Sequence, residues 1–350
     1  MKIVLLSLLS CCMQVLHAQQ PPNIFIITID GFRWQEVFEG ADSALLHDTR
    51  FTRDTALASM MYWAVSPQER RQKLLPFFWT VIAAKGQLQG NRRYGNDVDV
   101  ANLYKISYAG YSEMLTGTTD LRIFSNNKKW NNRVNVLEKL AELPAYQGKV
   151  VAFSSWDVFP YILNQQRNQL PINSGYNSTG DTGTTPLTML QAVQQYGVAN
   201  KGATRYDLLT FVTAMDYIEQ QLPKVVYLGF GEADEFAHHG RYDQYLHSAH
   251  QFDNLLQLLW YKIQTTPGYA NNTSMIITTD HGRGSKTQAA WQSHGPFVQG
   301  SGQVWRAAIG PAFEPLGEIK EVEKQYQKNL PQLVQQIAFM NGRSSMALAR

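Results

Sequence analysis

The sequence predicts an α/β fold with a mostly parallel central sheet and helices on both faces of that sheet. Five short segments rich in β-branched and aromatic residues recur along the chain, at 23–30, 148–156, 224–230, 273–280 and 303–310. Most are nearly continuous apolar runs, which is typical of strands buried on both faces. Helical patterns lie between them, and 350 residues are enough for one large domain of this class.

Three helices stand out between or after these strands. In segment 241–264 apolar side chains recur at alternating spacings of three and four, and the pattern stops before Pro267. A shorter helical stretch begins at Ser107 and closes at Gly117. We expect the last helix around 321–340, followed by Asn341-Gly342, a typical C-cap pair.

Two stretches fit this alternation poorly. Residues 35–100 contain scattered aromatic side chains and paired arginines, and residues 164–203 are rich in Asn, Gln, Gly and Thr. We interpret both as insertions at the rim of one sheet, so that residues 19–350 form a single domain.

The N-terminus has the pattern of a secretory signal peptide. Lys2 precedes an apolar stretch, and Ala18 is a small residue before a polar one, which predicts cleavage after residue 18. A lipoprotein site at Cys11 or Cys12 has less support because the apolar stretch before it is very short. Both cysteines lie in this segment, so the exported chain would have no disulfide, which suits a bacterial periplasm. No later segment is apolar for long enough to predict a transmembrane anchor.

The charge pattern gives no support for binding to a nucleic-acid polymer. Charged residues make up 17% of the chain and the formal net charge is +3, without a basic run longer than a pair. The oligomeric state is left open by the sequence.

Polar side chains follow three of the predicted strands. Asp30 ends the first strand, Asp234 and His238 follow the 224–230 strand, and Asp280 and His281 end the 273–280 segment. A single aspartate there is usually a turn former or a helix cap. Their recurrence at the same end of successive parallel strands indicates a ligand site instead, because that edge is where α/β sheets bind ligands.

Aspartate and histidine together suit zinc or a similar metal, whereas all-oxygen sets suit calcium or magnesium. With His294 there are at least six candidate ligands, enough for two metals, and paired metals are typical of phosphoryl-transfer sites. Ser107 and Ser112 are the candidate nucleophiles nearby. A serine at a helix start is most often an N-cap, but the same position directs amide N–H groups at an anion.

In the order of these motifs the sequence resembles the alkaline phosphatase superfamily, on the branch of nucleotide pyrophosphatases/phosphodiesterases and phosphonoacetate hydrolases. The order is a strand ending in Asp, a nucleophile ten residues before the glycine of a Thr-Gly pair, Asp-x3-His, Asp-His-Gly and a last His, over most of residues 23–340. Counting back from Gly117, the resemblance implies that Ser107 and not Ser112 is the nucleophile.

The resemblance also implies two metal sites. Asp234, His238 and His294 would form one of them, and the other would be formed by Asp30, Ser107, Asp280 and His281. The motif spacing leaves His239 out. Two side chains are candidates for substrate binding: Asn102, for which a turn asparagine is the alternative, and Arg283, for which a surface arginine is the alternative.

Sulfatases of the same superfamily have Cys/Ser-x-Pro-x-Arg at the nucleophile, whereas this chain has Ser107-Tyr108-Ala109-Gly110-Tyr111. Tyr111 in place of the arginine argues against formylglycine and against sulfatase activity. Ala109 stands where the similar proteins usually have proline, which removes no reacting group.

We therefore expect an exported hydrolase of phosphoric esters with two divalent metal ions, zinc in the first place and manganese or another divalent ion as alternatives. It would form a covalent phosphoserine on Ser107, and its partner would be a small phosphorylated substrate. Two alternatives stay open: a phosphodiesterase or phosphonate hydrolase of the same superfamily, and a metal-dependent phosphoester-binding protein without turnover.

Overall fold

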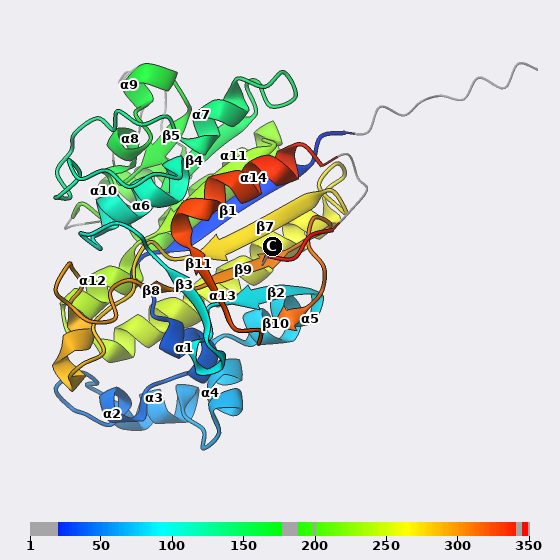
Figure 1. The fold of residues 1–350 in the computed structure, drawn as a ribbon. Coiled ribbons are helices and arrows are strands. Elements are labelled where there is room, and N and C mark those ends of the chain that lie inside the picture. The colour runs from blue at the N-terminus through cyan, green and yellow to red at the C-terminus, as the bar shows by residue number, and fades with distance from the viewer. Residues whose placement is uncertain (1–19, 177–187, 199–200, 341–344, 349–350) are drawn as a thin grey trace, which may run out of the picture.

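The computed structural model describes residues 20–176, 188–198, 201–340 and 345–348. Eight strands form the main sheet in the order β10-β2-β9-β7-β1-β6-β4-β5 (Figure 1). They are β1 (Asn23–Ile29), β2 (Gly86–Gln89), β4 (Val150–Ser154), β5 (Ile172–Ser174), β6 (Val225–Phe230), β7 (Thr273–Thr278), β9 (Arg306–Ile309) and β10 (Gly317–Glu318). Only β9 runs antiparallel to its neighbours β7 and β2, so the predicted mostly parallel sheet is confirmed.

Helices cover both faces of this sheet because β1 buries alternate side chains on opposite sides. Phe25 and Ile27 join one core with side chains of α11 (Asp207–Gln221) and α13 (Tyr242–Thr265). Ile24 joins the other core, with side chains from three helices of the opposite face: α6 (Ser107–Thr116), α7 (Val136–Ala141) and α14 (Leu330–Ala338). The predicted helices at 241–264 and from Ser107 to Gly117 are therefore present as α13 and α6.

A second, three-stranded sheet corrects two expectations. It has the order β11-β3-β8, formed by β3 (Asn96–Asp99), β8 (Gln303–Val304) and β11 (Glu323–Tyr326). The predicted 303–310 strand is therefore divided between two sheets. The predicted last helix is wrong over residues 323–326, where backbone pairing with β3 replaces helix, and only residues 330–338 form α14.

The two irregular stretches of the sequence contain short elements. Within residues 35–100 these are β2, β3, α2 (Ser43–Leu46), α3 (Thr55–Tyr62), α4 (Pro67–Leu74), η1 (Phe78–Ile82), α5 (Ala83–Lys85) and η2 (Arg92–Tyr94), with α1 (Trp34–Glu39) at the start. In the described parts of 164–203 they are α9 (Gln165–Asn168), β5 and α10 (Met189–Tyr196). The remaining elements are α8 (Phe159–Ile162), α12 (Glu232–His238), η3 (Gln288–Gln292) and η4 (Gln327–Asn329). Since β2 lies inside the main sheet, the 35–100 stretch contributes to the sheet as well as to its rim.

Three sequence expectations fall on residues outside the described part: the signal peptide at 1–18, the C-cap pair Asn341-Gly342 and part of the 164–203 stretch. Within the described part, no helix has the length and apolar character needed to cross a bilayer. The parallel strands β1, β6 and β7 are neighbours in register, so their carboxyl ends meet at one edge of the sheet. That edge holds the candidate site.

Candidate metal centre

Two aspartates and a histidine converge where β1 and β7 end side by side. Asp30 follows β1, and Asp280 and His281 follow β7. The His281 Nε2 atom lies 3.4 Å from Asp30 Oδ1 and 3.5 Å from Asp280 Oδ2. All three side chains are buried. One ligand atom from each lies within 4.8 Å of the others, so these residues could hold a metal ion.

A second group of potential ligands adjoins the first. Asp234 of α12, His281 and His294 likewise bring one ligand atom each to within 4.8 Å of one another. His238, one turn after Asp234 on α12, has its Nε2 atom 3.1 Å from Asp234 Oδ2 and 3.1 Å from His294 Nε2. The fold thus brings all six predicted Asp and His residues together, and it places His281 between the two groups.

Backbone carbonyls orient the two buried or partly buried imidazoles. The Nδ1 atom of His281 lies 3.0 Å from Gly282 O, and that of His294 lies 2.9 Å from Lys105 O. A carbonyl only accepts, so Nδ1 carries the proton in each ring and Nε2 keeps its lone pair, which faces the carboxylates of Asp30 and Asp280 in His281 and the His238 ring in His294. This is the tautomer in which histidine binds a metal through Nε2.

In the described part of the chain, neither Asp30 nor Asp280 forms an ion pair with an arginine or lysine. Burial, together with the charges of Asp280 and Asp234, raises the pKa of Asp30 well above its ordinary value. Burial and the charge of Asp234 also raise the pKa of Asp280. Burial lowers the pKa of His281 and of His294, so these rings stay neutral at pH 7.

The donor set fits divalent cations. Within the described structure, Asp30 Oδ1 and Asp280 Oδ2 are buried and have no hydrogen-bond partner. Such atoms are costly to leave unpaired, and a cation between them removes the cost. Carboxylate oxygens mixed with neutral imidazoles match zinc and similar metals better than calcium or magnesium.

Ser107 lies beside these ligands at the start of α6. Its Oγ atom is 3.2 Å from His281 Nε2, and the residue is buried. Gly110, one turn along, lets the helix approach β7 closely: an ideal Cβ there would be 2.4 Å from the carbonyl oxygen of Asp280. Ser112, the other candidate nucleophile, instead has its Oγ atom 2.9 Å from Asn131 Nδ2.

Tyr111 is a functional candidate that the sequence reasoning missed. Its hydroxyl donates to Asp30 Oδ2 at 3.1 Å, and the side chain is buried. It stands four residues after Ser107, so helical spacing puts the two on one face of α6. That spacing was the available signal.

A chain of hydrogen bonds links α6 to His294. The carboxylate of Glu113 on α6 accepts from Asn102 Nδ2 at 2.9 Å. Asn102 Oδ1 accepts from the amide of Lys105 at 2.7 Å, and Lys105 O holds the His294 ring. The side-chain nitrogen of Asn102 is therefore bonded to α6, and its side-chain oxygen to the turn that precedes Ser107.

Arg283 lies inside the site, not on the surface. It is 1% exposed, and its Nη1 forms an ion pair with Asp234 Oδ1. His239 is different: it is exposed and its Nδ1 lies 2.7 Å from Glu235 O on its own helix.

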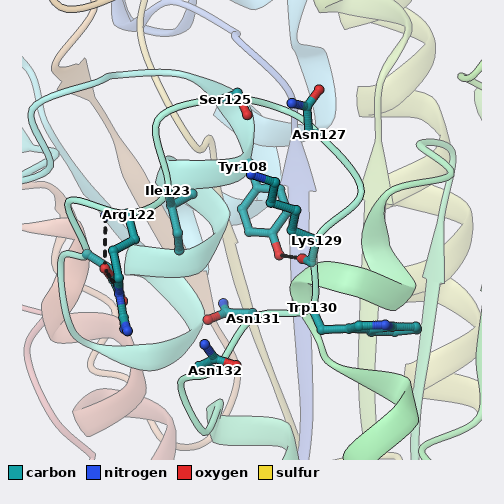
Figure 2. A pocket seen from close by; sticks show the side chains of 10 residues that line it. Tyr108, Arg122, Ile123, Ser125, Asn127, Lys129, Trp130, Asn131 and Asn132 are labelled. Atoms are coloured by element: carbon teal, nitrogen blue, oxygen red, sulfur yellow. Dashed lines mark hydrogen bonds and ion pairs between the residues drawn. The ribbon is translucent and has the colours of Figure 1, made fainter.

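A separate pocket of about 130 Å³ adjoins α6 (Figure 2). Tyr108 reaches into it, donating to the carbonyl of Lys129, and the remaining lining comes from the 120–132 segment. Asn126 of that segment accepts from the Tyr108 amide at 3.0 Å, so the segment is fastened to the first turn of α6. Neither Ser107 nor a candidate metal ligand lines this pocket.

Comparison with known proteins identifies the fold. No family model matches the sequence, and no curated protein matches it. Solved structures, in contrast, match its fold. The lipoteichoic acid synthase LtaP from Listeria monocytogenes matches with a TM-score of 0.59 and 10% identity over 94% of this chain and 75% of that chain. Murine ectonucleotide pyrophosphatase/phosphodiesterase 5 gives 0.54 and 12%, over 93% and 97% of the two chains.

A protein of the alkaline phosphatase superfamily from Vibrio parahaemolyticus matches with a TM-score of 0.50 and 12% identity, over 91% of this chain and 67% of that chain. Sulfatases also stand among the matching structures. At such low sequence identities the likeness shows the fold and not the activity. The fold of this chain is that of the alkaline phosphatase superfamily.

Proposed function

We propose that this chain is a hydrolase of phosphoric esters that uses two divalent metal ions, zinc in the first place, and Ser107 as its nucleophile. The observation that carries the proposal is the position of Ser107 Oγ, 3.2 Å from His281 Nε2 and beside two buried carboxylates with unpartnered oxygens. A hydroxyl next to such a donor set is what nucleophilic attack on phosphorus requires.

Asp30, Asp280, His281 and Ser107 would hold one ion, and Asp234, His238 and His294 the other. When bound, the ions supply positive charge that lowers the pKa of a neighbouring hydroxyl and offsets the charge on phosphate oxygens. The start of α6 adds to this, since the amides of its first turn and the helix dipole favour negative charge at Ser107.

The reaction would proceed in two displacements. In the first, a bond forms between Ser107 Oγ and phosphorus while the bond from phosphorus to the leaving oxygen breaks; Ser107 gives its proton to solvent and the leaving oxygen takes one. In the second, a water oxygen attacks the phosphoserine, the Ser107 oxygen leaves and regains a proton, and phosphate departs. His281 stays fixed by its bond to Gly282 O through both steps.

A diester as the preferred substrate is the second candidate, and one observation favours it. Asn102 and Arg283, the side chains considered for binding phosphate oxygens, are both occupied by other groups. A monoester needs extra positive charge around its non-bridging oxygens, whereas a diester does not.

The experiment uses the chain without residues 1–18, loaded with zinc. Hydrolysis of p-nitrophenyl phosphate, bis-p-nitrophenyl phosphate and p-nitrophenyl sulfate is measured for the wild type, Ser107→Ala and Ser112→Ala. Ser112 is the matched control because it is a buried serine on the same helix.

We expect turnover of a phosphate ester that falls by more than about a thousandfold in Ser107→Ala and by less than about tenfold in Ser112→Ala. Preference for the sulfate would support a sulfatase instead. Two bound zinc ions without any turnover would support the phosphoester-binding alternative, and full activity of Ser107→Ala would exclude Ser107 as the nucleophile.

We also propose that the protein is exported to a bacterial periplasm, on the basis of the N-terminal sequence. N-terminal sequencing of protein recovered from the periplasm should begin at Gln19. Recovery of the intact N-terminus from the cytoplasm would contradict export.

A further inference from the structure

Arg283 is held in a fixed position against one candidate metal ligand. Its Nε donates to Trp291 O at 2.8 Å, its Nη2 to Gln292 O at 3.1 Å, and its Nη1 to Asp234 Oδ1. Trp291 itself is wedged edge-on against the rings of Tyr242 and Tyr245. Because two of its nitrogens bond to backbone carbonyls, the guanidinium cannot move away from Asp234 without losing one buried and one partly buried hydrogen bond.

The other group of ligands has no such partner. Among the described residues, the Asp30 carboxylate accepts a hydrogen bond from the neutral phenol of Tyr111, and the Asp280 carboxylate accepts one from the backbone amide of Gly31 at 3.1 Å. Within the described residues no arginine or lysine pairs with either carboxylate, and each retains an unpartnered oxygen. Asp234 thus has a direct ion pair with Arg283, whereas Asp30 and Asp280 have no direct ion pair with an arginine or lysine among the described residues.

We propose that Arg283 makes the two metal sites unequal: the site of Asp30, Asp280 and His281 binds a divalent cation first and tightly, and the site of Asp234, His238 and His294 binds second and more weakly. A cation entering the second site meets one carboxylate whose charge is already offset and an arginine a few ångströms away. The first site offers two carboxylates that, within the described residues, have no ion pair with an arginine or lysine and each have an unpartnered oxygen. This inference rests on the proposed function, since it assumes two divalent ions at these residues.

An opposite role for Arg283 is also physically reasonable, and the test separates the two. A group that only orients a metal ligand raises metal affinity, and its removal typically lowers affinity about 10- to 100-fold. Repulsion predicts the reverse. The sign of the change in affinity on removing the charge therefore distinguishes repulsion from orientation.

The experiment is a calorimetric titration of metal-free protein with Zn²⁺, without substrate. We expect two classes of binding in the wild type, differing by at least about tenfold in affinity. Asp280→Asn should weaken the tight class and His238→Ala the weak class, which assigns each class to its residues. Arg283→Gln should tighten the weak class by about tenfold or more and leave the tight class unchanged.

Arg283→Lys is the matched control because it keeps the charge and loses the fork of donors. We expect its weak class to stay within about threefold of the wild type. If Arg283→Gln does not fold, as judged by thermal unfolding of the metal-free protein, Arg283→Met provides the same loss of charge with an unbranched chain in the same space.

Weaker binding in the second class of both Arg283→Gln and Arg283→Lys would overturn the proposal in favour of an orienting role. Two equal classes in the wild type would overturn it as well, while leaving the proposed function intact. Absence of zinc binding in all variants would instead contradict the metal-dependent function on which the inference rests.

Discussion

Gly110 offers the sharpest test of how the fold positions the nucleophile. An alanine Cβ at this position would lie 2.4 Å from the carbonyl oxygen of Asp280 and 3.0 Å from its carbonyl carbon. Both atoms belong to the backbone and cannot rotate away. Reaching ordinary van der Waals separation therefore requires α6 and the end of β7 to move apart by about 1 Å.

Ser107 lies three residues earlier on α6 and moves with the helix. A displacement of about 1 Å in a reacting group costs on the order of a hundredfold in rate. We therefore expect Gly110→Ala to lower kcat/KM for the preferred ester about 100-fold. Overpacking should lower the free energy of unfolding by about 1–3 kcal/mol and better helix propensity should raise it by about 1 kcal/mol, so we expect a net loss of up to about 2 kcal/mol.

The assay is steady-state hydrolysis of that ester at saturating zinc, with urea unfolding on the same samples. Gly202→Ala is the control, because the nearest atom to a Cβ there is Thr204 N at 3.9 Å. Activity of Gly110→Ala within about threefold of the control, with unfolding unchanged, would refute the argument that close contact between α6 and β7 fixes the position of Ser107.

Three further predictions follow from the same structure. Tyr111→Phe removes the donor to Asp30 Oδ2 and should weaken the tighter zinc class about tenfold; unchanged affinity in a calorimetric titration would contradict this. Burial raises the pKa of Asp253 from 3.8 to about 7 in the folded protein. Its protonated form is thus favoured by folding, and the stability it contributes, fully present below pH 3.8, is lost as the pH rises through 7. Between pH 5 and 8 this loss in the free energy of unfolding is at most about 3 kcal/mol. Urea unfolding of Asp253→Asn should show no such loss. If the wild type and Asp253→Asn lose stability equally over this pH range, Asp253 is not the cause. Finally, removing zinc with a chelator should lower the unfolding temperature, more at pH 8 than at pH 5, because the unpaired carboxylates of the site then repel one another; equal melting curves with and without zinc would count against a metal centre.

The main sheet could be predicted because strands buried on both faces have nearly continuous apolar sequences. The runs that became β1, β6 and β7 are almost wholly apolar, and the period of α13 is that of a helix with one buried face. Residues 323–326 have no such apolar run. They pair with β3, more than 200 positions earlier, and this tertiary pairing overrides a helical local pattern.

The candidate site could be predicted as a set of residues but not as a geometry. Its ligands follow strand ends, and parallel strands bring their carboxyl ends to one edge, so convergence follows from topology. The ion pair of Arg283 with Asp234 and the bond from Tyr111 to Asp30 join residues 49 and 81 positions apart. No local pattern encodes such contacts, so the sequence placed Arg283 toward substrate or solvent and gave Tyr111 no partner.

The hydrogen bonds from Glu113 through Asn102 and Lys105 to His294 have a mechanical consequence. The helix that presents Ser107 also anchors, through this turn, a ligand that comes 187 positions later in the chain. The nucleophile and this ligand are therefore held by the same helix. When α6 shifts against the sheet, Ser107 and His294 move together, and the distances that change are those from these two residues to the ligands after β1 and β7. How far thermal motion disturbs the site therefore depends on the contact between α6 and the end of β7, where Gly110 lies against Asp280.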